Sequence, residues 1–184
     1  VEQVALRKHM EGAKFMIEWG CGGSTHLAAC QVGIPTVYSI DSHPDWIAKV
    51  KAATAGCPGK VDAMHVDVGP VGAWGTPSGL DHMAQWRLYP SAIQRIPGAA
   101  GADLVFIDGR WRVSCLFYAL LTVGDGAKIM IHDFWPRPAY HAVLPVVEVL
   151  DRAGSLAVVR KKASPAAAPE VLRYMAEWYH SKPA

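Results

Sequence analysis

The stretch Phe15-Met16-Ile17-Glu18-Trp19-Gly20-Cys21-Gly22-Gly23-Ser24-Thr25 decides how this 184-residue chain folds. Apolar residues lead into Glu18, as in a buried strand, and three glycines follow close behind. Glycine accepts positive φ and lets the backbone approach a ligand closely, so the cluster indicates a tight turn. Ser24 or Thr25 is a suitable N-cap for a helix over residues 26–31. The pattern predicts a strand, a glycine turn and a helix, whose amides form a lip for a nucleotide-like ligand.

The composition is that of a globular domain with a sizeable core. Hydrophobic residues make up 51% of the chain, charged residues make up 18%, and the net charge is +2. This charge is too small to argue for binding to nucleic acid or to a membrane surface. No apolar run has the length of a membrane span, and no charged-then-apolar leader precedes the domain. We therefore expect one domain over residues 1–184.

The four cysteines are scattered along the chain without a C-x-x-C pair: Cys21, Cys30, Cys57 and Cys115. This spacing does not favour a metal cluster. Reduced thiols are typical of cytoplasmic proteins. We therefore expect four reduced thiols in a cytoplasmic protein.

Strands and helices are expected to alternate along the chain. The predicted strands cover residues 14–19, 34–40, 61–66, 103–107, 128–131 and 155–160. The predicted helices cover residues 1–12, 26–31, 44–55, parts of 83–96, 112–121, 140–152 and 170–180. The helix within 83–96 is expected to break near Pro90. The last helix follows an Ala/Pro-rich linker, and the two together form the tail 163–184. Ser42, two residues before Pro44, resembles an N-cap. This alternation predicts a Rossmann-like three-layer α/β/α sandwich around a mostly parallel sheet of six to seven strands.

Five consecutive predicted strands finish on an acidic residue: Glu18, Asp41, Asp67, Asp108 and Asp133. In doubly wound sheets, ligands bind outside the carboxyl ends of the strands, near the point where the strand order reverses. We therefore expect a rim of carboxylates around the glycine turn and place the functional site there. Each acid also has a structural interpretation: Glu18 as a strand-end acid that binds amides, Asp41 as a helix cap, and Asp67 as the start of a turn.

The glycine turn departs from the dinucleotide-binding pattern, because Thr25 stands where that pattern has its third glycine. A carboxylate at Glu18 would repel a pyrophosphate and would suit an ammonium or sulfonium group. Asp41 follows Gly20 by 21 residues, the usual distance for an acid that accepts ribose hydroxyls. These residues together favour a positively charged nucleoside without phosphates, a description that fits S-adenosylmethionine.

From Phe15 to about Arg160 the chain resembles the class I S-adenosylmethionine-dependent methyltransferases, through the motif Glu18-x-Gly20-x-Gly22-x-Ser24-Thr25 and the ordered strand-end acids. The resemblance implies that Glu18 and Gly20 flank the methionine moiety, that Asp41 holds the ribose, and that Asp67 with Val68 borders the adenine. The predicted cofactor-binding residues are Glu18, Gly20, Cys21, Gly22, Ser24, Thr25, Asp41, Ser42, Asp67, Val68 and Asp108.

The ends of the fourth and fifth predicted strands carry the candidate catalytic residues. Asp108 follows one strand, and His132 with Asp133 follows the other. If the strands are neighbours, these three side chains converge near the transferable methyl group. Methyl transfer is an in-line displacement on carbon, so the protein chiefly has to position the acceptor and take its proton. We predict His132 or Asp133 as the base.

The same strand ends resemble those of the small O-methyltransferases of the catechol and macrocin type, which carry metal-binding acids there. The resemblance implies Asp108 and Asp133 as metal ligands, and magnesium is the ion that carboxylates and water suit best. The chain departs from this type at Phe134, which replaces an asparagine ligand, and no lysine closely follows Asp108. Metal-assisted and metal-free mechanisms both stay open at this point.

Three arginines near these strand ends, Arg110, Arg112 and Arg137, have paired donors suited to an anionic acceptor. Their structural interpretation is that they neutralise the acidic rim. Trp74 lies in the Gly/Pro-rich loop 68–79, and loops of this length are usually functional or mobile. We predict that Trp74 covers the cofactor or acceptor, with packing on the core as the ordinary alternative. The predicted substrate-binding residues are Trp74, Arg110 and Arg137.

The leading hypothesis is S-adenosylmethionine-dependent methyl transfer to a small or glycosidic acceptor. Oxygen is favoured as the acceptor atom because no Asn/Asp-Pro-Pro-Tyr-type motif follows the fourth strand. The alternatives are an NAD-dependent oxidoreductase of Rossmann type and a methyltransferase-like binding protein without catalysis. The expected partner is a small-molecule acceptor, with no nucleic acid and no membrane. The oligomeric state stays open, a homodimer included, and the sequence does not identify the acceptor.

Overall fold

A computed structural model describes residues 1–180 and contains one seven-stranded sheet. The strands are β1 (Phe15–Trp19), β2 (Thr36–Asp41), β3 (Lys60–His65), β4 (Leu104–Ile107), β5 (Lys128–Ile131), β6 (Val147–Ala153) and β7 (Leu156–Lys161). Their order is β3-β2-β1-β4-β5-β7-β6, with β1 to β5 parallel and β7 antiparallel to both of its neighbours. The predicted Rossmann-like α/β fold with a mostly parallel sheet is confirmed. Residues 181–184 of the predicted tail lie outside the described residues.

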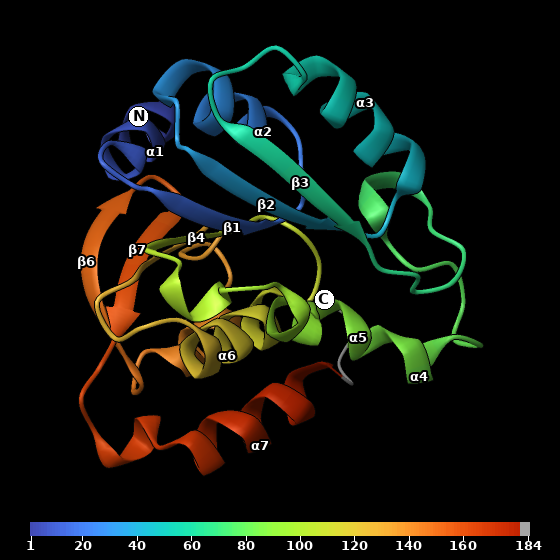
Figure 1. The fold of residues 1–184 in the computed structure, drawn as a ribbon. Helices are drawn as coiled ribbons and strands as arrows, with labels where there is room; N and C mark the ends of the chain where they lie inside the picture. The colour runs from blue at the N-terminus through green and yellow to red at the C-terminus, as the bar shows by residue number, and fades with distance from the viewer. Residues whose placement is uncertain (181–184) are drawn as a thin grey trace.

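Helices cover both faces of the sheet (Figure 1). The α-helices are α1 (Glu2–Met10), α2 (Gly23–His26), α3 (Pro44–Thr54), α4 (Met83–Trp86), α5 (Leu88–Ser91), α6 (Arg112–Thr122) and α7 (Pro169–His180). The π-helix η1 (Leu27–Val32) continues α2, and the 3-10 helices are η2 (Ala73–Gly75), η3 (Ala92–Arg95), η4 (Ala99–Gly101), η5 (Pro138–Val143) and η6 (Pro165–Ala167). None of the helices in the described part of the chain is long and apolar enough to cross a membrane.

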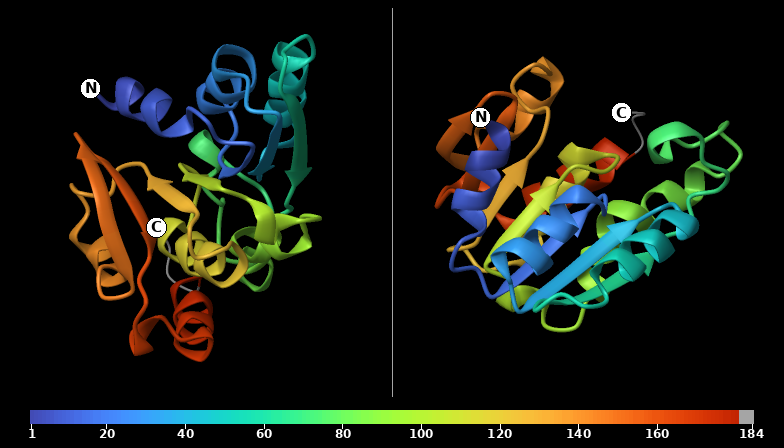
Figure 2. Two further views of the ribbon diagram at one scale, coloured as in Figure 1. Left: turned by 60° about the vertical axis from the view of Figure 1, so that its left-hand side comes forward. Right: turned by 90° about the horizontal axis from the view of Figure 1, so that it is seen from above.

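The sheet is buried on both sides, as expected for parallel strands. Phe106 belongs to the core on one side of the sheet, with residues of α1 and η1, whereas Val105 and Ile107 belong to the core on the other side, with residues of α6 and α7. The turned views in Figure 2 place α1, α2 and α3 on one side and α7 on the other. This alternation follows from the two-residue period of a strand.

The strand order reverses beside β1, which lies between β2 and β4. Trp19, the last residue of β1, is level with Ile40 of β2 and Ile107 of β4. The chain leaves β1 through the glycine turn at the carboxyl edge of the sheet. Because β1 to β5 are parallel, all five predicted acidic strand ends lie along this edge.

The helix predicted over residues 140–152 is wrong. Residues Pro138–Val143 form the short 3-10 helix η5, and Val147–Ala153 form the edge strand β6. Strands β6 and β7 make a hairpin around Gly154, whose φ of +61° suits a two-residue turn. Pairing with β7 therefore overrides the helical spacing of the apolar residues.

Three predicted helix boundaries also differ from expectation. The N-cap of α2 is Gly22, and Ser24 and Thr25 lie inside the helix. The N-cap of α3 is His43 rather than Ser42, which is buried. The break expected near Pro90 falls at Arg87, between α4 and α5. Pro90 lies inside the first turn of α5, where a missing amide proton costs no intrahelical hydrogen bond.

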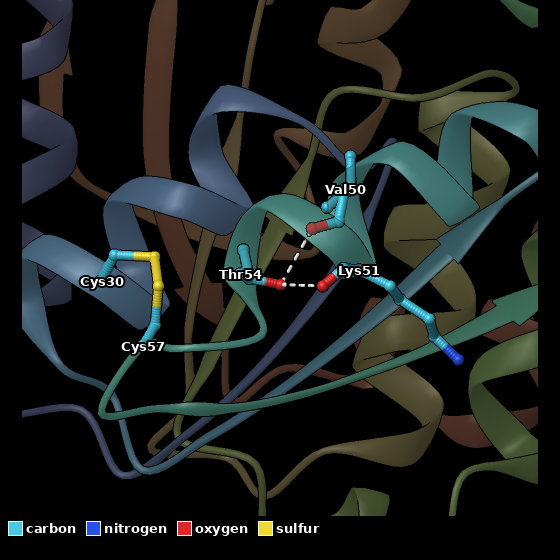
Figure 3. The surroundings of a disulfide bond; sticks show 5 residues. All are labelled: Cys30, Val50, Lys51, Thr54 and Cys57. Carbon is cyan, nitrogen blue, oxygen red and sulfur yellow. Dashed lines mark hydrogen bonds between the residues drawn. A yellow bond between two sulfur atoms is a disulfide. The ribbon is translucent and has the colours of Figure 1, made fainter.

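A disulfide joins Cys30 to Cys57, with 4.6 Å between their Cα atoms (Figure 3). The expectation of four reduced thiols is wrong for this pair, while Cys21 and Cys115 are free and buried. Cys30 lies in η1, and Cys57 lies in the turn after α3. Their separation of 27 residues carries no local signal, and only the packing of these two segments brings the sulfur atoms together.

Candidate functional site

A cleft of about 970 Å³ opens at the carboxyl ends of β1, β2 and β4. Its walls come from the ends of β2, β1, β4 and β5, which are neighbours in the sheet, and from α1, α3 and the loop that carries Trp74. Among the residues that line it are Glu2, Gly20, Cys21, Gly22, Ser24, Asp41, Ser42, Trp46, Trp74, Tyr89, Asp108, Gly109, Arg110 and His132. The cleft thus occupies the position at which doubly wound sheets bind ligands.

The turn after β1 touches the turn after β4 without intervening side chains. Gly20 has a φ of +89°, and a Cβ atom there would lie 2.9 Å from the amide nitrogen of Gly109. A Cβ atom on Gly109 would in turn lie 2.2 Å from the hydroxyl oxygen of Tyr89. Glycine at both positions therefore sets the floor of the cleft.

Glu18 is fully buried beneath the glycine turn and does not line the cleft. Its carboxylate accepts hydrogen bonds from the hydroxyls of Ser24 at 2.7 Å, Ser39 at 2.6 Å, and Thr25. Burial raises the pKa of Glu18, and the three hydroxyl donors work against that rise. Thr25 also accepts the amide proton of Gly22 at 2.8 Å. Glu18 and Thr25 therefore fix the turn from below rather than face a ligand.

Asp41 is placed both to hold the start of α3, as a helix-capping acid does, and to face a ligand in the cleft. Its carboxylate accepts the amide protons of Cys21 at 3.0 Å and of His43, the N-cap of α3, at 2.9 Å, and it also lines the cleft. A carboxylate has about four lone-pair positions, so further acceptor capacity stays available for a ligand. The indole of Trp46 donates to the carbonyl of Cys21 at 2.6 Å and adds a flat apolar surface beside Asp41.

Arg112 holds the ends of β4 and β5 together. Its guanidinium lies 3.0 Å from a carboxylate oxygen of Asp108 and 3.0 Å from one of Asp133, and it donates to the carbonyl of His132 at 2.7 Å. Only 10% of its side chain is exposed. A buried guanidinium thus lies between the two carboxylates that were predicted as metal ligands.

The structure does not support the predicted magnesium site. Among residues 1–180, no group of three or more His, Cys, Asp or Glu side chains is arranged to hold a metal ion. Burial opposes ionisation of Asp133, but the hydrogen bond from Arg112 and the charges of His132, Arg112 and Arg137 lower its pKa overall. A cation already occupies the space between these acids, so we derive no step through a metal.

His132 faces the cleft between two carboxylates. Its Nδ1 lies 2.9 Å from Asp108 and its Nε2 lies 3.2 Å from Glu2 of α1. The hydrogen bond to Asp108 raises the pKa of His132, together with the charges of Asp108 and Asp133, while burial and Arg112 oppose the rise. The predicted convergence of Asp108, His132 and Asp133 is therefore present, with Asp108 and His132 in the wall of the cleft and Asp133 just outside it.

Some site residues carry no local signal in the sequence. Glu2 reads as an ordinary first-turn acid, yet it accepts the amide proton of Ser155 at 2.5 Å and contacts His132. Trp46 is 45% exposed and lies in the wall of the cleft, and Tyr89 borders the cleft although it is buried in the core. Long-range packing alone places all three at the site.

The remaining predicted residues divide into two groups. Trp74 is 92% exposed on the cleft edge with a φ of +60°, and Arg110 lies in the wall. Asp67, Val68, Asp133 and Arg137 do not line the cleft: Asp67 is exposed and accepts the amide proton of Gly69, Val68 is buried, and Asp133 pairs with Arg137 at 3.2 Å. The functional roles assigned to all these residues stay predictions.

The fold and the position of the cleft define a class: this is the Rossmann-like α/β fold found in methyltransferases. No family model and no curated protein matches the chain. A methyltransferase-like protein (spo2022) from Silicibacter pomeroyi DSS-3 is 28% identical with a TM-score of 0.82, over 95% of this chain and 93% of that one.

More distant structures share the fold. The N-methyltransferase NodS from Bradyrhizobium japonicum WM9 is 13% identical with a TM-score of 0.53, over 87% of this chain and 92% of that chain. It has also been crystallised with S-adenosyl-L-homocysteine. TrmN from Thermus thermophilus is 14% identical with a TM-score of 0.56, over 87% of this chain and 48% of that chain.

Proposed function

We propose that the chain binds S-adenosylmethionine in this cleft and transfers the methyl group to a small acceptor. One observation carries the proposal: the glycine turn and a fixed Asp41 meet at the point where the strand order reverses. The similarity to the methyltransferase-like protein from Silicibacter pomeroyi over nearly the whole chain supports it.

The residues of the cleft fit this cofactor. Gly20 and Gly22 leave the backbone open to close approach, and Asp41 has spare acceptor capacity for ribose hydroxyls. Trp46 and Trp74 offer flat surfaces at the walls. When bound, the cofactor supplies an activated methyl group on a sulfonium centre, and the carboxylate of Asp108 lies in the wall of the same cleft.

His132 is the base in this proposal. Asp108 holds Nδ1, so the proton of an acceptor hydroxyl is taken at Nε2. Glu2 contacts that nitrogen at 3.2 Å, so the ring as it stands donates a proton from each nitrogen to a carboxylate. To act as base, Nε2 first has to release its proton to solvent, and the acceptor hydroxyl then has to take the place of Glu2. Asp133 is paired with Arg112 and Arg137, so its role is to position Arg112 rather than to accept the proton.

The alternatives make different demands on the fold. Dinucleotide-binding sheets have the parallel order 3-2-1-4-5-6, whereas here the antiparallel β7 lies between β5 and β6. Together with Thr25 in the glycine pattern, this disfavours an NAD-dependent oxidoreductase. A binding protein without catalysis is favoured by one observation, the engagement of both ring nitrogens of His132.

Calorimetry separates these functions. We expect S-adenosylmethionine and S-adenosylhomocysteine to bind at one site with micromolar affinity, and NAD to show no binding. Binding of NAD alone, or of none of the three, would overturn the proposal. A screen of hydroxylated acceptors with detection of methylated product then separates an enzyme from a binding protein. The cytoplasmic location, the oxygen acceptor and the absence of nucleic-acid and membrane partners stay predictions.

A further inference from the structure

Three guanidinium groups follow the ends of β4 and β5, and two of them, Arg112 and Arg137, share two carboxylates. Arg112 pairs with both Asp108 and Asp133 at 3.0 Å. Arg137 pairs with Asp133 at 3.2 Å and lies 5.5 Å from the centre of the Tyr140 ring. These two arginines neutralise the acidic strand ends, as the structural interpretation of the sequence anticipates.

Arg110 has no such partner. Within residues 1–180, no carboxylate lies within ion-pair distance of its guanidinium, and that group makes no hydrogen bond. The side chain is nevertheless half-buried in the wall of the cleft. Burial, with the nearby charge of Arg112, lowers the pKa of the guanidinium. Partial burial of a charge without a partner is costly, which indicates that a ligand supplies the missing anion.

We propose that Arg110 binds an anionic group of the methyl acceptor, so that the acceptor is a small hydroxylated carboxylate or phosphate. A guanidinium presents a planar fork of donors that matches both anions. This inference rests on the proposed methyl transfer and names the class of its acceptor.

The acceptor has two separate anchor points in this arrangement. Its hydroxyl faces Nε2 of His132, and its anion faces Arg110, which is two residues beyond Asp108 in the chain. Two residues span at most about 7 Å of backbone, and His132 contacts Asp108 at 2.9 Å. The two anchors therefore lie near one another, at the ends of the paired strands β4 and β5. This spacing favours a small acceptor over a polymer. Asp108 and Glu2 place a carboxylate on each side of His132, so the anion belongs at the Arg110 end.

The test is an NMR titration of the protein saturated with S-adenosylhomocysteine. The probes are benzoate and inorganic phosphate, with benzamide as the neutral counterpart of benzoate. We compare the wild type with Arg110→Gln and with Arg95→Gln, which removes an equal charge from an exposed site on η3 outside the cleft. We expect saturable shifts with at least one anion, weakened about 10-fold or more in Arg110→Gln and unchanged in Arg95→Gln, because hydrogen bonds to charged groups are strong. The comparison of the affinities for benzoate and for phosphate identifies which anion the site prefers.

Three outcomes would overturn the inference. The first is the absence of saturable binding of either anion, and the second is equal binding of benzamide. The third is a loss of S-adenosylhomocysteine affinity in Arg110→Gln, since Arg110 would then bind the cofactor's own carboxylate. Failure of S-adenosylhomocysteine to bind the wild type would instead sink the proposed function, and titration of the cofactor-free protein would still measure anion binding at Arg110. Arg110→Lys keeps the charge but loses the planar fork of donors, so its affinity for the anion is expected to lie between those of the wild type and Arg110→Gln.

Discussion

The carboxylates in and beside the two halves of the cleft are held by different means. On the β1 and β2 side, Glu18 and Asp41 accept hydrogen bonds from hydroxyls and backbone amides, which carry no charge. On the β4 and β5 side, Asp108 and Asp133 pair with the charged side chains of Arg112 and His132. The first half is designated the cofactor half here, and the second is the acceptor half.

In the cofactor half the acids are held by neutral donors, which fix the shape of the turn. In the acceptor half they are held by charged side chains. The donors of the cofactor half do not titrate in the ordinary pH range, because they are hydroxyls and amides, so a change of pH acts on this half through its acids alone. The titratable partner His132 makes the acceptor half depend on pH. The two acids of this half pair with Arg112 and Arg137, and no acid among residues 1–180 pairs with Arg110. We therefore expect damage to the cofactor half to act mainly on stability and cofactor affinity. Changes in the acceptor half are expected to act on pH dependence and acceptor choice.

The largest effect is expected from Gly20→Ala in the cofactor half. The φ of +89° and the 2.9 Å approach to Gly109 leave no room for a Cβ atom. Left-handed strain and overpacking together are expected to cost about 2–5 kcal/mol of unfolding free energy. Gly23→Ala is the matched control, because a Cβ atom there meets nothing within 4 Å. Urea unfolding measures both, and equal stability of the two variants would contradict the tight contact between the turns.

Loss of the disulfide is the next largest effect. The Cys30–Cys57 bond ties η1 to the turn after α3, behind the cofactor half, and closes a loop of 27 residues. Its reduction is expected to lower the unfolding free energy by about 2–4 kcal/mol. Urea unfolding with and without dithiothreitol measures this change, and Cys57→Ser is expected to remove the response to the reductant. A mass spectrum of the untreated protein with four free thiols would refute the pairing.

Asp41→Ala tests the cofactor half through affinity. The variant is expected to weaken S-adenosylhomocysteine binding by about 1–3 kcal/mol, because the ribose hydroxyls and the amide of Cys21 lose a charged acceptor. Asp81→Ala, an exposed change outside the cleft, is the control in the same calorimetric titration. Unchanged affinity of Asp41→Ala would count against Asp41 as the ribose ligand.

The acceptor half is expected to show a pH dependence of stability of about 1 kcal/mol, the scale of partly exposed ion pairs. The pKa of His132 is raised above 6.5 in the folded protein. Its contribution is therefore fully present below pH 6.5 and is lost as the pH rises through the folded value. His132→Gln is expected to flatten this part of the stability curve, while a variant of the exposed His26 keeps it. A wild-type slope that survives in His132→Gln would reject this assignment.

The smallest expected effect is that of a chelator. Because Arg112 lies between Asp108 and Asp133, EDTA is expected to leave methyl transfer unchanged with any acceptor that the screen identifies. Turnover is measured before and after EDTA treatment and after addition of magnesium. Loss of turnover that magnesium restores would show that Arg112 moves aside for an ion.

Local patterns sufficed for the strands and for the position of the site. Apolar runs that end in an acid gave β1, β2, β4 and β5, because strand periodicity and glycine breaks act over a few residues. The same reasoning failed over residues 140–152, where pairing of β6 with β7 decides the conformation. It also missed Glu2, whose partners His132 and Ser155 are more than a hundred residues away along the chain.

The sequence by itself determined the alternation of strands and helices, the glycine turn and the strand-end acids, because each depends on neighbouring residues only. The tertiary structure decided which acid faces the cleft, which acid is buried, and which arginine is left without a partner. Hydrogen bonds and ion pairs act over a few ångströms between residues far apart in the chain. Only the folded arrangement therefore places Arg112 between two carboxylates and Arg110 in the wall of the cleft.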